Sequence, residues 1–567
     1  MRQHLAVCMA LLFALSLVAI PIGSAATVQA TGTATPQEGD VATASTTLQS
    51  DGDVSDGGVV HTCAMDPPED YADPAEDGLG WSNGYWYDEP LDVNTTGGLN
   101  ESEFDALVAR TEARVEAIRC LPFENETTVE VITREEFANE TAQWNVSEDR
   151  RAFENVVYEA LLLVDDTDVA EVRRENLETG VGGYYDPATD RIVVIADDEE
   201  SLEFDETVLA HELGHALQDQ QFDLSRFDEQ MLDASTAENG LIEGDVGYVE
   251  QLYEGACEDG VWADTCIEVQ DPEPAPGPDD LANVGLYLLS FQPYSDGPAF
   301  VDARYEYDPG EQSAGNWGPV NELYENPPGT TAEVISPDRY PSYKSTNVTI
   351  QDNSTDEWER LTVEGRPDYE TVGQAGLFTM FANPTFDSAA DQLIEPSELQ
   401  DNDSPYRLYN YSNEYVTGWD GDRLQVYESE DGETGYVWAT EWESEEDALA
   451  FRQGYDRLLD DAWSMDRVEG RAGTYESGDA FAGAYYVDRE GTQVSIVHAP
   501  TVDQLSDLES TAESTTEWEL PQSTPADDTG TGTDTGTDEI PGFGIVAAVI
   551  GLFGAFLIVL RRRRNGG

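Results

Sequence analysis

Residues 207–217 read Thr-Val-Leu-Ala-His-Glu-Leu-Gly-His-Ala-Leu and contain the His-Glu-x-x-His pattern at His211, Glu212 and His215. Two histidines four positions apart leave the same face of an α-helix, so the pattern predicts a helix that presents two imidazoles side by side. The other residues of the segment are apolar or small, as a buried helix requires. Neutral imidazoles are common zinc ligands, and a carboxylate beside the metal can accept a proton from bound water. His211 and His215 are therefore candidate zinc ligands, and Glu212 is the candidate general base.

The bare pattern also occurs in ordinary helices, where two histidines simply pack, so its context matters. The chain contains only five histidines, of which His4 lies in the predicted signal peptide, and two of the other four fall in this motif. This concentration favours a zinc site over packed histidines. Two weaker candidates for oxyanion stabilisation are Tyr248 and His498, although core packing is the simpler interpretation of both.

A catalytic zinc requires a third protein ligand and an open coordination position. In the metzincin pattern a glycine and a histidine would follow the motif where this chain has Gln218 and Gln221, so that class is excluded. No histidine occurs after the motif until His498. The third ligand is therefore expected to be a carboxylate.

The next predicted helix supplies the candidate carboxylate, Glu243, which follows His215 by 28 positions. Gly240 and Gly244 flank Glu243 and would let its helix approach the metal closely. Asp245 is a candidate to accept a proton from a ligand histidine. Two neighbouring carboxylates remain rivals of Glu243 as the third ligand: Glu238 and Asp245.

The segment 211–224, HELGHALQDQQFDL, together with 241–245, LIEGD, resembles a family of secreted or lipid-anchored prokaryotic proteins, most of them known as predicted metalloproteases. The resemblance runs from about residue 101 to residue 459. It implies a gluzincin-like α+β domain of zincin type that holds Zn²⁺ through the three candidate ligands and acts on a peptide or protein substrate. It also implies that the predicted strand 191–196 is the edge strand that binds substrate.

The composition is strongly acidic. The chain has 27 Lys and Arg against 117 Asp and Glu among 567 residues, which gives a formal net charge of −90. Nucleic acid is excluded as a partner, because a polyanion is bound through many Lys and Arg contacts. Disorder does not explain the acidity, since 39% of the residues are hydrophobic and 10% are aromatic. Acidic residues spread along a chain with a single lysine, Lys344, resemble proteins of halophilic archaea, whose carboxylates keep the surface hydrated in strong salt.

Both ends of the chain predict export. Residues 1–25 combine Arg2, an apolar run and small residues, which is typical of a secretory signal peptide. The apolar run 541–560 is long enough to cross a bilayer as a transmembrane helix, and the arginines that follow it place 561–567 in the cytoplasm.

Pro541, Gly542 and Phe543 open that apolar run, and the C-terminus resembles the PGF-CTERM sorting signal of haloarchaeal surface proteins. The resemblance implies an archaeosortase as the processing partner. It also implies attachment to the cell membrane, either by this helix or by a lipid that replaces it after processing.

Four cysteines remain after loss of the signal peptide, an even number that is typical of two disulfides in an exported protein. Of the three connectivities we favour Cys257–Cys266, which closes a short loop, together with Cys63–Cys120. Nine Asn-x-Ser/Thr sequons are candidate sites for a surface glycoprotein.

Hydrophobic periodicity and turn residues predict an α+β protein with two folded units. The predicted helices are 101–120, 153–164, 204–221, 234–253 and one capped by Ser444, and the predicted strands are 128–133, 183–186, 191–196, 423–427, 435–442, 484–487 and 492–498. The predicted organisation is a signal peptide (1–25), a disordered low-complexity segment (26–62), a zincin-like metallopeptidase domain (63–345), a polar linker (346–366), a smaller C-terminal α+β domain (367–510), a Thr/Asp-rich stalk (511–540), the PGF-CTERM transmembrane segment (541–560) and an Arg-rich tail (561–567).

The sequence therefore predicts a cell-surface zinc metallopeptidase in which Glu212 is the general base and zinc activates water. The alternative is a non-catalytic structural or binding protein on a zinc-stabilised zincin scaffold. The sequence identifies neither a substrate nor an oligomeric state.

Overall fold

The computed structural model describes residues 62–513, except residues 77, 94–97, 144–145, 197–205, 259–260, 263–264, 268–276, 307–314, 388–389 and 403. The predicted signal peptide and transmembrane segment, and the predicted stalk from residue 514 onward, lie outside the described residues. Among the residues that are described, no helix is both long enough and apolar enough to span a bilayer.

A small sheet of three strands lies beside the helix that carries the histidine motif. Its order is β3 (Thr128–Thr133), β5 (Arg191–Ala196) and β4 (Gly183–Asp186), with β3 parallel and β4 antiparallel to β5. The sequence of β5, Arg-Ile-Val-Val-Ile-Ala, is buried at five consecutive positions, as expected of a strand covered on both faces. The expectation that 191–196 forms the edge strand is therefore wrong, because β5 is central and β3 and β4 are the edges.

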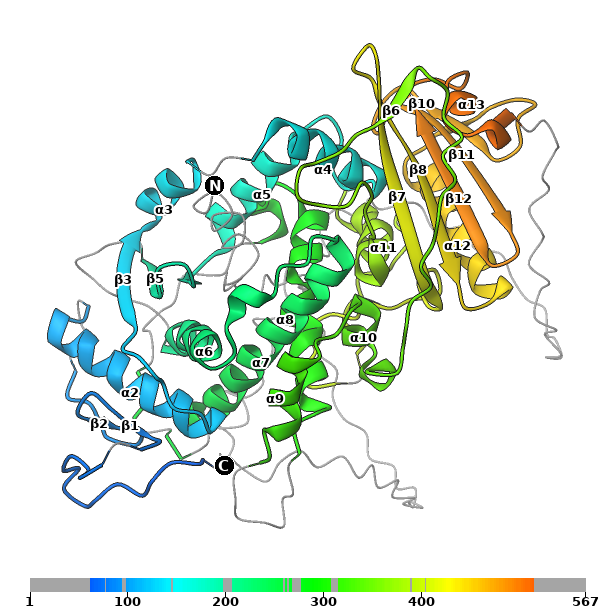
Figure 1. The fold of residues 1–567 in the computed structure, drawn as a ribbon. Coiled ribbons are helices and arrows are strands. Elements are labelled where there is room, and N and C mark those ends of the chain that lie inside the picture. Colours follow the sequence, from blue (N-terminus) through cyan, green and yellow to red (C-terminus); the bar gives the residue numbers. More distant parts are fainter. Residues whose placement is uncertain are drawn as a thin grey trace, which may run out of the picture.

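Three long helices pack against one another beside this sheet, and apolar side chains from all of them form one buried cluster with side chains of the sheet. They are α2 (Glu101–Arg119), α6 (Glu206–Phe222) and α7 (Leu232–Glu258). Figure 1 shows α6 nearly end-on, between the strands β3 and β5 and the helix α7. The two helices predicted to carry the metal ligands are thus neighbours.

Buried ion pairs fasten α2 to both of these helices. Arg110 and Arg114 donate to the Glu206 carboxylate at the start of α6, at distances of 3.0 and 2.8 Å. Arg119 donates to Asp245 of α7 at 2.8 Å. Since a buried charge is tolerated only when it is paired, these contacts fix α2 against α6 and α7 at defined positions.

Glycines bring α7 close to its neighbours. A Cβ at Gly244 would lie 2.4 Å from the carbonyl oxygen of Gly297 in α8 (Val284–Asp302), and a Cβ at Gly214 of α6 would lie 3.0 Å from Val246. A Cβ at Gly240 would lie 2.9 Å from Val334. Gly240 and Gly244 therefore permit close packing of α7 against other helices, and not the predicted close approach to a metal.

A second sheet of seven antiparallel strands lies at the other end of the molecule (Figure 1). Its strands, in spatial order, are β6 (Trp358–Arg360), β7 (Trp419–Ser429), β8 (Thr434–Trp442), β12 (Gln493–Ala499), β11 (Gly483–Glu490), β10 (Thr474–Ser477) and β9 (Asp466–Arg467). β7, β8, β11 and β12 contain the four strands predicted there. The segment 346–366, predicted as a polar linker, contributes the edge strand β6.

The helix α12 (Glu445–Arg457) packs on this sheet. The Ser444 side chain accepts a hydrogen bond from the backbone N–H of Asp447, which is the predicted cap. Phe451 and Tyr455 of this helix are fully buried. Capping and apolar periodicity together placed this helix correctly.

The large sheet shares its hydrophobic core with helices that precede it in the chain. One buried cluster joins the sheet to α4 (Glu148–Ala160), α8 and α11 (Gly373–Ala382). The apolar core is therefore continuous across the segment 346–366.

The remaining elements are shorter and complete the described part of the chain. They are the hairpin β1 (Trp81–Ser82) and β2 (Tyr85–Trp86), the helices α3 (Arg134–Thr141), α5 (Val169–Gly180), α9 (Gly318–Glu325), α10 (Thr331–Ile335) and α13 (Leu505–Leu508), and the single-turn helices η1 (Leu224–Arg226), η2 (Pro278–Asp280), η3 (Pro337–Arg339), η4 (Asn383–Phe386), η5 (Leu458–Ala462) and η6 (Ser510–Glu513).

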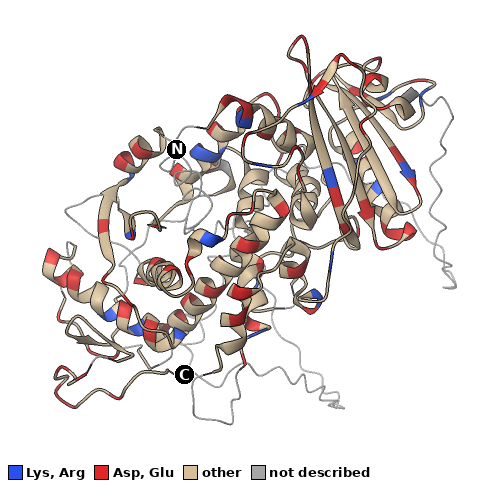
Figure 2. Cartoon of the chain, viewed as in Figure 1, with Lys and Arg blue, Asp and Glu red and all other residues tan. Residues whose placement is uncertain are grey.

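Both favoured disulfides are confirmed. Cys63–Cys120 ties the first described residues to the end of α2, with the two Cα atoms 5.2 Å apart. Cys257–Cys266 closes the loop at the end of α7, with a Cα separation of 5.7 Å. Figure 2 shows acidic residues on almost every element and few basic ones, in keeping with the composition.

Candidate functional site

The His-Glu-x-x-His motif lies in the middle of α6, as the sequence predicted. His211, Glu212 and His215 are all buried, with at most 3% of each residue exposed. The four-residue spacing places both imidazoles on the face of α6 that is turned toward α7.

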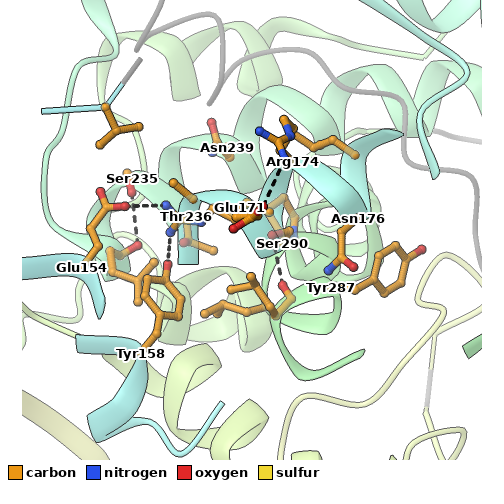
Figure 3. A pocket seen from close by; sticks show the side chains of 18 of the residues that line it. Glu154, Tyr158, Glu171, Arg174, Asn176, Ser235, Thr236, Asn239, Tyr287 and Ser290 are labelled. Atoms are coloured by element: carbon orange, nitrogen blue, oxygen red, sulfur yellow. Dashed lines mark hydrogen bonds and ion pairs between the residues drawn. The ribbon is translucent and has the colours of Figure 1, made fainter. Parts of the chain in front are cut away.

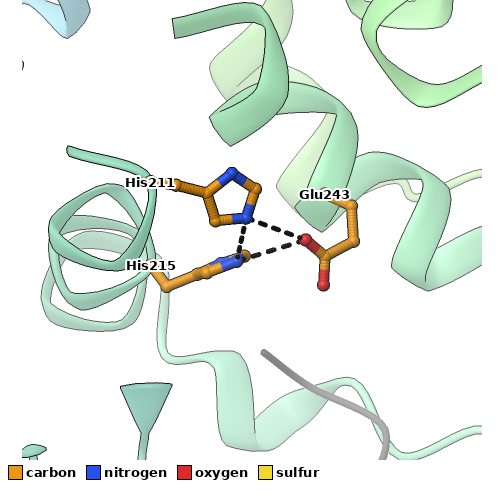
Figure 4. Close-up of side chains that lie close together, drawn as sticks. All are labelled: His211, His215 and Glu243. Atoms are coloured by element: carbon orange, nitrogen blue, oxygen red, sulfur yellow. Dashed lines mark hydrogen bonds and ion pairs between the residues drawn. The ribbon is translucent and has the colours of Figure 1, made fainter. Parts of the chain in front are cut away.

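Glu243 of α7 completes a compact group with the two histidines (Figure 4). The Nε2 atoms of His211 and His215 are 3.1 Å apart, and they lie 3.3 and 3.2 Å from Oε2 of Glu243. Glu243 is 2% exposed, so all three groups meet in the protein interior. The structure thus brings together the three residues predicted as metal ligands.

The spacing of these atoms suits a tetrahedral zinc ion. Zinc lies about 2.0–2.2 Å from imidazole nitrogen and carboxylate oxygen, which separates neighbouring ligand atoms by about 3.3 Å in a tetrahedron. The three observed separations, 3.1, 3.2 and 3.3 Å, are close to that value. Two imidazoles and one carboxylate form a zinc-binding donor set, and they leave one of four positions open.

The outward nitrogens of both histidines are held by hydrogen bonds. His211 Nδ1 lies 2.9 Å from Glu250 Oε2, and His215 Nδ1 lies 3.0 Å from Gln218 Oε1. Gln218 Nε2 donates to the carbonyl of Ile242 at 2.9 Å, which turns its Oε1 toward the histidine. With a metal bound, each Nδ1 would carry the ring proton and each Nε2 would be the nitrogen left to face the metal.

Three acceptor atoms so close together require a positive charge between them, and the pKa values of the metal-free site reflect this. Burial opposes ionisation of Glu243, but the charge of His215 and hydrogen bonds from both histidines outweigh it and lower the pKa of Glu243 to about 2. Burial alone would lower the pKa of His211, but hydrogen bonds to Glu243 and Glu250 raise it well above 6.5.

The side chain of Glu212 lies against the edge strand β4. A Cβ built at Gly183, the first residue of β4, would lie 3.3 Å from Cγ and 3.4 Å from Oε1 of Glu212. Glu212 itself is fully buried. The absence of a side chain at position 183 thus lets the strand edge and the candidate base lie side by side.

A cavity of about 350 Å³ reaches the site (Figure 3). Glu243 and Tyr294 are among its lining residues, and the Tyr294 ring stacks on the His211 ring with a centroid distance of 6.2 Å. The sequence analysis did not identify Tyr294, Glu250 or Gln218 as parts of the site.

Glu238 and Asp245 of α7, the alternatives to Glu243 as third ligand, make other contacts. Asp245 pairs with Arg119 and accepts a hydrogen bond from Tyr324 at 2.7 Å, so it is not the proton acceptor of a ligand histidine. Glu238 accepts a hydrogen bond from the backbone N–H of Glu229 at 3.3 Å, and burial raises the pKa of Glu238 to about 7. Neither belongs to the group of convergent ligand atoms.

The two weaker candidates for oxyanion stabilisation are packed elsewhere. Tyr248 donates to Asp302 at 3.0 Å and lies against the Tyr406 ring. His498 lies in β12 and stacks on Tyr436 with a centroid distance of 5.1 Å, and burial lowers the pKa of His498 to about 4. Packing is the role that the described contacts assign to both.

Comparison with known proteins identifies two parts of the chain. A domain of unknown function, DUF8575, matches residues 359–509, which hold the seven-stranded sheet. The PGF-CTERM motif matches residues 540–562. No curated protein and no solved structure matches the chain significantly.

Proposed function

We propose that this surface protein, which is exported, processed by an archaeosortase and anchored to the cell membrane at its C-terminus, is a zinc-dependent metallopeptidase. His211, His215 and Glu243 would hold the zinc ion, and Glu212 would act as the general base. The substrate would be a peptide or a protein outside the cell.

The observation that carries this proposal is the convergence of three buried ligand atoms within 3.3 Å of one another. Hydrogen bonds at the outward nitrogens orient both imidazoles toward the same point. A histidine pair that only packed in a core would need neither the buried carboxylate of Glu243 next to both Nε2 atoms nor a hydrogen-bond acceptor, Glu250 or Gln218, at each Nδ1. Three protein ligands and an open fourth position are characteristic of catalytic zinc sites.

The zinc ion, when bound, would polarise the substrate carbonyl and lower the pKa of a water molecule. Glu212 follows the ligand His211 directly in α6, and its carboxylate would accept the proton of the attacking water and pass it to the leaving amine. The open edge of β4 beside Glu212 would pair with an extended peptide, which presents its main-chain carbonyls to the site. Burial of the triad excludes bulk water, which strengthens the electrostatic interactions of the reacting groups.

The test compares three variants of the full-length protein in molar salt: Glu212→Gln, His215→Ala and Glu238→Gln. Glu212→Gln should keep a full equivalent of zinc and lose about 10²–10⁴-fold in peptide cleavage, because the ligands stay but the base is gone. His215→Ala should lose zinc and cleavage together. Glu238→Gln is the matched control, since it removes a buried carboxylate of α7 outside the triad and should change neither property.

The measurements are zinc content by elemental analysis and cleavage of a quenched fluorescent peptide library. Equal cleavage by the parent protein and Glu212→Gln, each loaded with zinc, would overturn the catalytic assignment. Zinc binding without cleavage in any variant would leave the non-catalytic, zinc-stabilised scaffold as the answer. Absence of zinc from the parent protein would contradict both the peptidase and the zinc-stabilised scaffold.

A further inference from the structure

The cavity next to the metal ligands lies between α4, α5, α7 and α8 (Figure 3). Its volume of about 350 Å³ falls in the range of about 300–1,000 Å³ that is typical of ligand pockets. Since Glu243 is one of its lining residues, a molecule bound at the metal ligands can extend directly into it.

One wall of the cavity is a polar face of α7. Ser235, Asn239 and Glu243 follow one another at four-residue spacing, so they lie on the same side of the helix, and all three line the cavity. No hydrogen bond joins the Asn239 side chain to another residue within the described part of the chain. Its amide therefore has both donors and an acceptor to offer to a ligand.

The opposite wall carries four arginines from α4 and α5: Arg150, Arg151, Arg173 and Arg174. All four form ion pairs with carboxylates, and in three of them the pair is at hydrogen-bond distance. Arg150 and Arg173 share Glu154, at 2.6 and 2.8 Å, and Arg151 pairs with Asp168 at 2.8 Å. Since one carboxylate neutralises two guanidinium groups at Glu154, the wall keeps an excess of positive charge there.

Arg174 has the longest ion-pair distances of the four arginines. Its closest carboxylate oxygens, on Glu171 and Glu178, are 3.6 and 3.4 Å away, and no hydrogen bond to either is formed. Its side chain is 35% exposed. A guanidinium group has five N–H donors in a planar fork that matches a carboxylate, so Arg174 can bind one more acid.

The lining of this cavity is much less acidic than the chain as a whole. The protein as a whole has more than four acidic residues for each basic one, yet the cavity is lined by four arginines and only three carboxylates. One of those carboxylates is Glu243, which the metal would neutralise. Figure 2 shows basic residues on α4 and α5, among elements that are otherwise mostly acidic.

We propose that the cavity is a specificity subsite that receives an acidic side chain, Asp or Glu, of the bound peptide, with Arg174 as its anchor. Asn239 would hold the peptide main chain beside it. This proposal rests on the proposed function for its substrate class, a peptide. The net charge of the protein repels acidic peptides, so any preference for them has to arise from a local site of this kind.

The experiment measures binding and not cleavage. The full-length protein carrying Glu212→Gln, which removes the base, is titrated with fluorescent decapeptides that contain a single Glu among uncharged residues, at a different position in each peptide. A second set has Gln in place of that Glu. Molar salt screens exposed charges to about 3 Å, so the remaining preference reports on the cavity. At one position the Glu peptide should bind about tenfold more tightly than its Gln counterpart.

Arg174→Gln, made in the same background, should abolish this difference without changing the zinc content or the circular dichroism spectrum. Arg457→Gln is the matched control, because it removes an exposed arginine of an i,i+4 pair on α12, away from the cavity lining, and should leave the difference intact. Equal binding of the Glu and Gln peptides at every position would overturn the proposal, as would a preference that persists in Arg174→Gln.

Failure of this proposal is distinguishable from failure of the proposed function. If the variant binds Glu peptides through Arg174 and the parent protein cleaves none of them, the subsite stands and the peptidase assignment falls. If the parent protein cleaves peptides without regard to acidic residues, the peptidase assignment stands and the subsite falls.

Discussion

Glu250 and Gln218 contact the Nδ1 atoms of the two histidines of the candidate metal site, on the side of each ring away from Glu243. Each accepts a hydrogen bond from an Nδ1–H, and this contact fixes both the orientation of the ring and the nitrogen that is left for a metal. An ionised acceptor such as Glu250 also makes the imidazole a stronger ligand than a neutral acceptor would.

We therefore expect Glu250→Ala to weaken zinc binding by about 10–100-fold, while leaving all three ligands in place. Glu250→Gln should lose less, because its amide oxygen can still accept the hydrogen bond from His211. Competition with a chromogenic chelator measures the affinity. Glu254→Ala, an exposed position one turn further along α7, is the control, and an affinity of Glu250→Ala equal to that of the control would contradict the expectation.

The helical period explains which parts of the site the sequence could reveal. The two histidines four positions apart are a local signal, and Glu243 was chosen from its position in the next helix. At 3.6 residues per turn, Glu238 and Asp245 point well away from Glu243 on α7, so they cannot share its ligand position. Glu250 follows Glu243 by seven positions, two turns along the same face, and this spacing could have identified it.

At the level of elements, the site depends on how closely α7 packs against α6 and α8. At Gly244 the backbones of α7 and α8 approach each other without room for a side chain, and at Gly214 the space of a side chain is taken by Val246 of α7. The placement of Glu243 against the α6 histidines is thus a consequence of glycine positions on three helices.

Gly244→Ala should destabilise the protein by at least about 1–3 kcal/mol, because its Cβ would lie 2.4 Å from a backbone oxygen of α8 and the helices would have to move apart. Chemical denaturation at constant salt measures the free energy of unfolding. Gly255→Ala on the same helix is the control: its Cβ would meet nothing within 4 Å, so alanine should be neutral or stabilise by up to about 1 kcal/mol. Equal stabilities of the two variants would refute the packing argument.

Elements with a clear period were predicted, and those without one were missed. The strand 128–133 and the capped helix α12 agree with the structure closely. The helix α11 was not identified, because its sequence, Gly-Gln-Ala-Gly-Leu-Phe-Thr-Met-Phe-Ala, is almost entirely apolar or small and has no polar face. The short strand β6 owes its position to pairing with distant residues, Trp358 lying opposite Ser429, which no local pattern encodes.

At the scale of the whole molecule, the charge of −90 is the dominant property. Acidic residues cover most elements in Figure 2, whereas several of the few arginines are buried in ion pairs such as those of α2. Repulsion between surface carboxylates therefore has to be screened by the solvent, since the protein offers few exposed cations.

Lowering the NaCl concentration from about 3 M to about 0.2 M should destabilise the folded protein, because the screening length grows from under about 3 Å to several Å. We expect the midpoint of thermal unfolding to fall by roughly 5–10 °C, which corresponds to a few kcal/mol. Circular dichroism with temperature measures it, with KCl at the same ionic strength as the control for specific ion effects. A midpoint that is unchanged or higher at low salt would contradict this prediction.

The shared core also has a consequence for the region that the DUF8575 model matches. DUF8575 matches residues 359–509, but α4, which packs on β7 and β8, lies some two hundred residues earlier in the chain. A polypeptide limited to the matched region would therefore lack part of the apolar packing on its sheet. The matched region thus depends for part of its core on a segment that the match does not include.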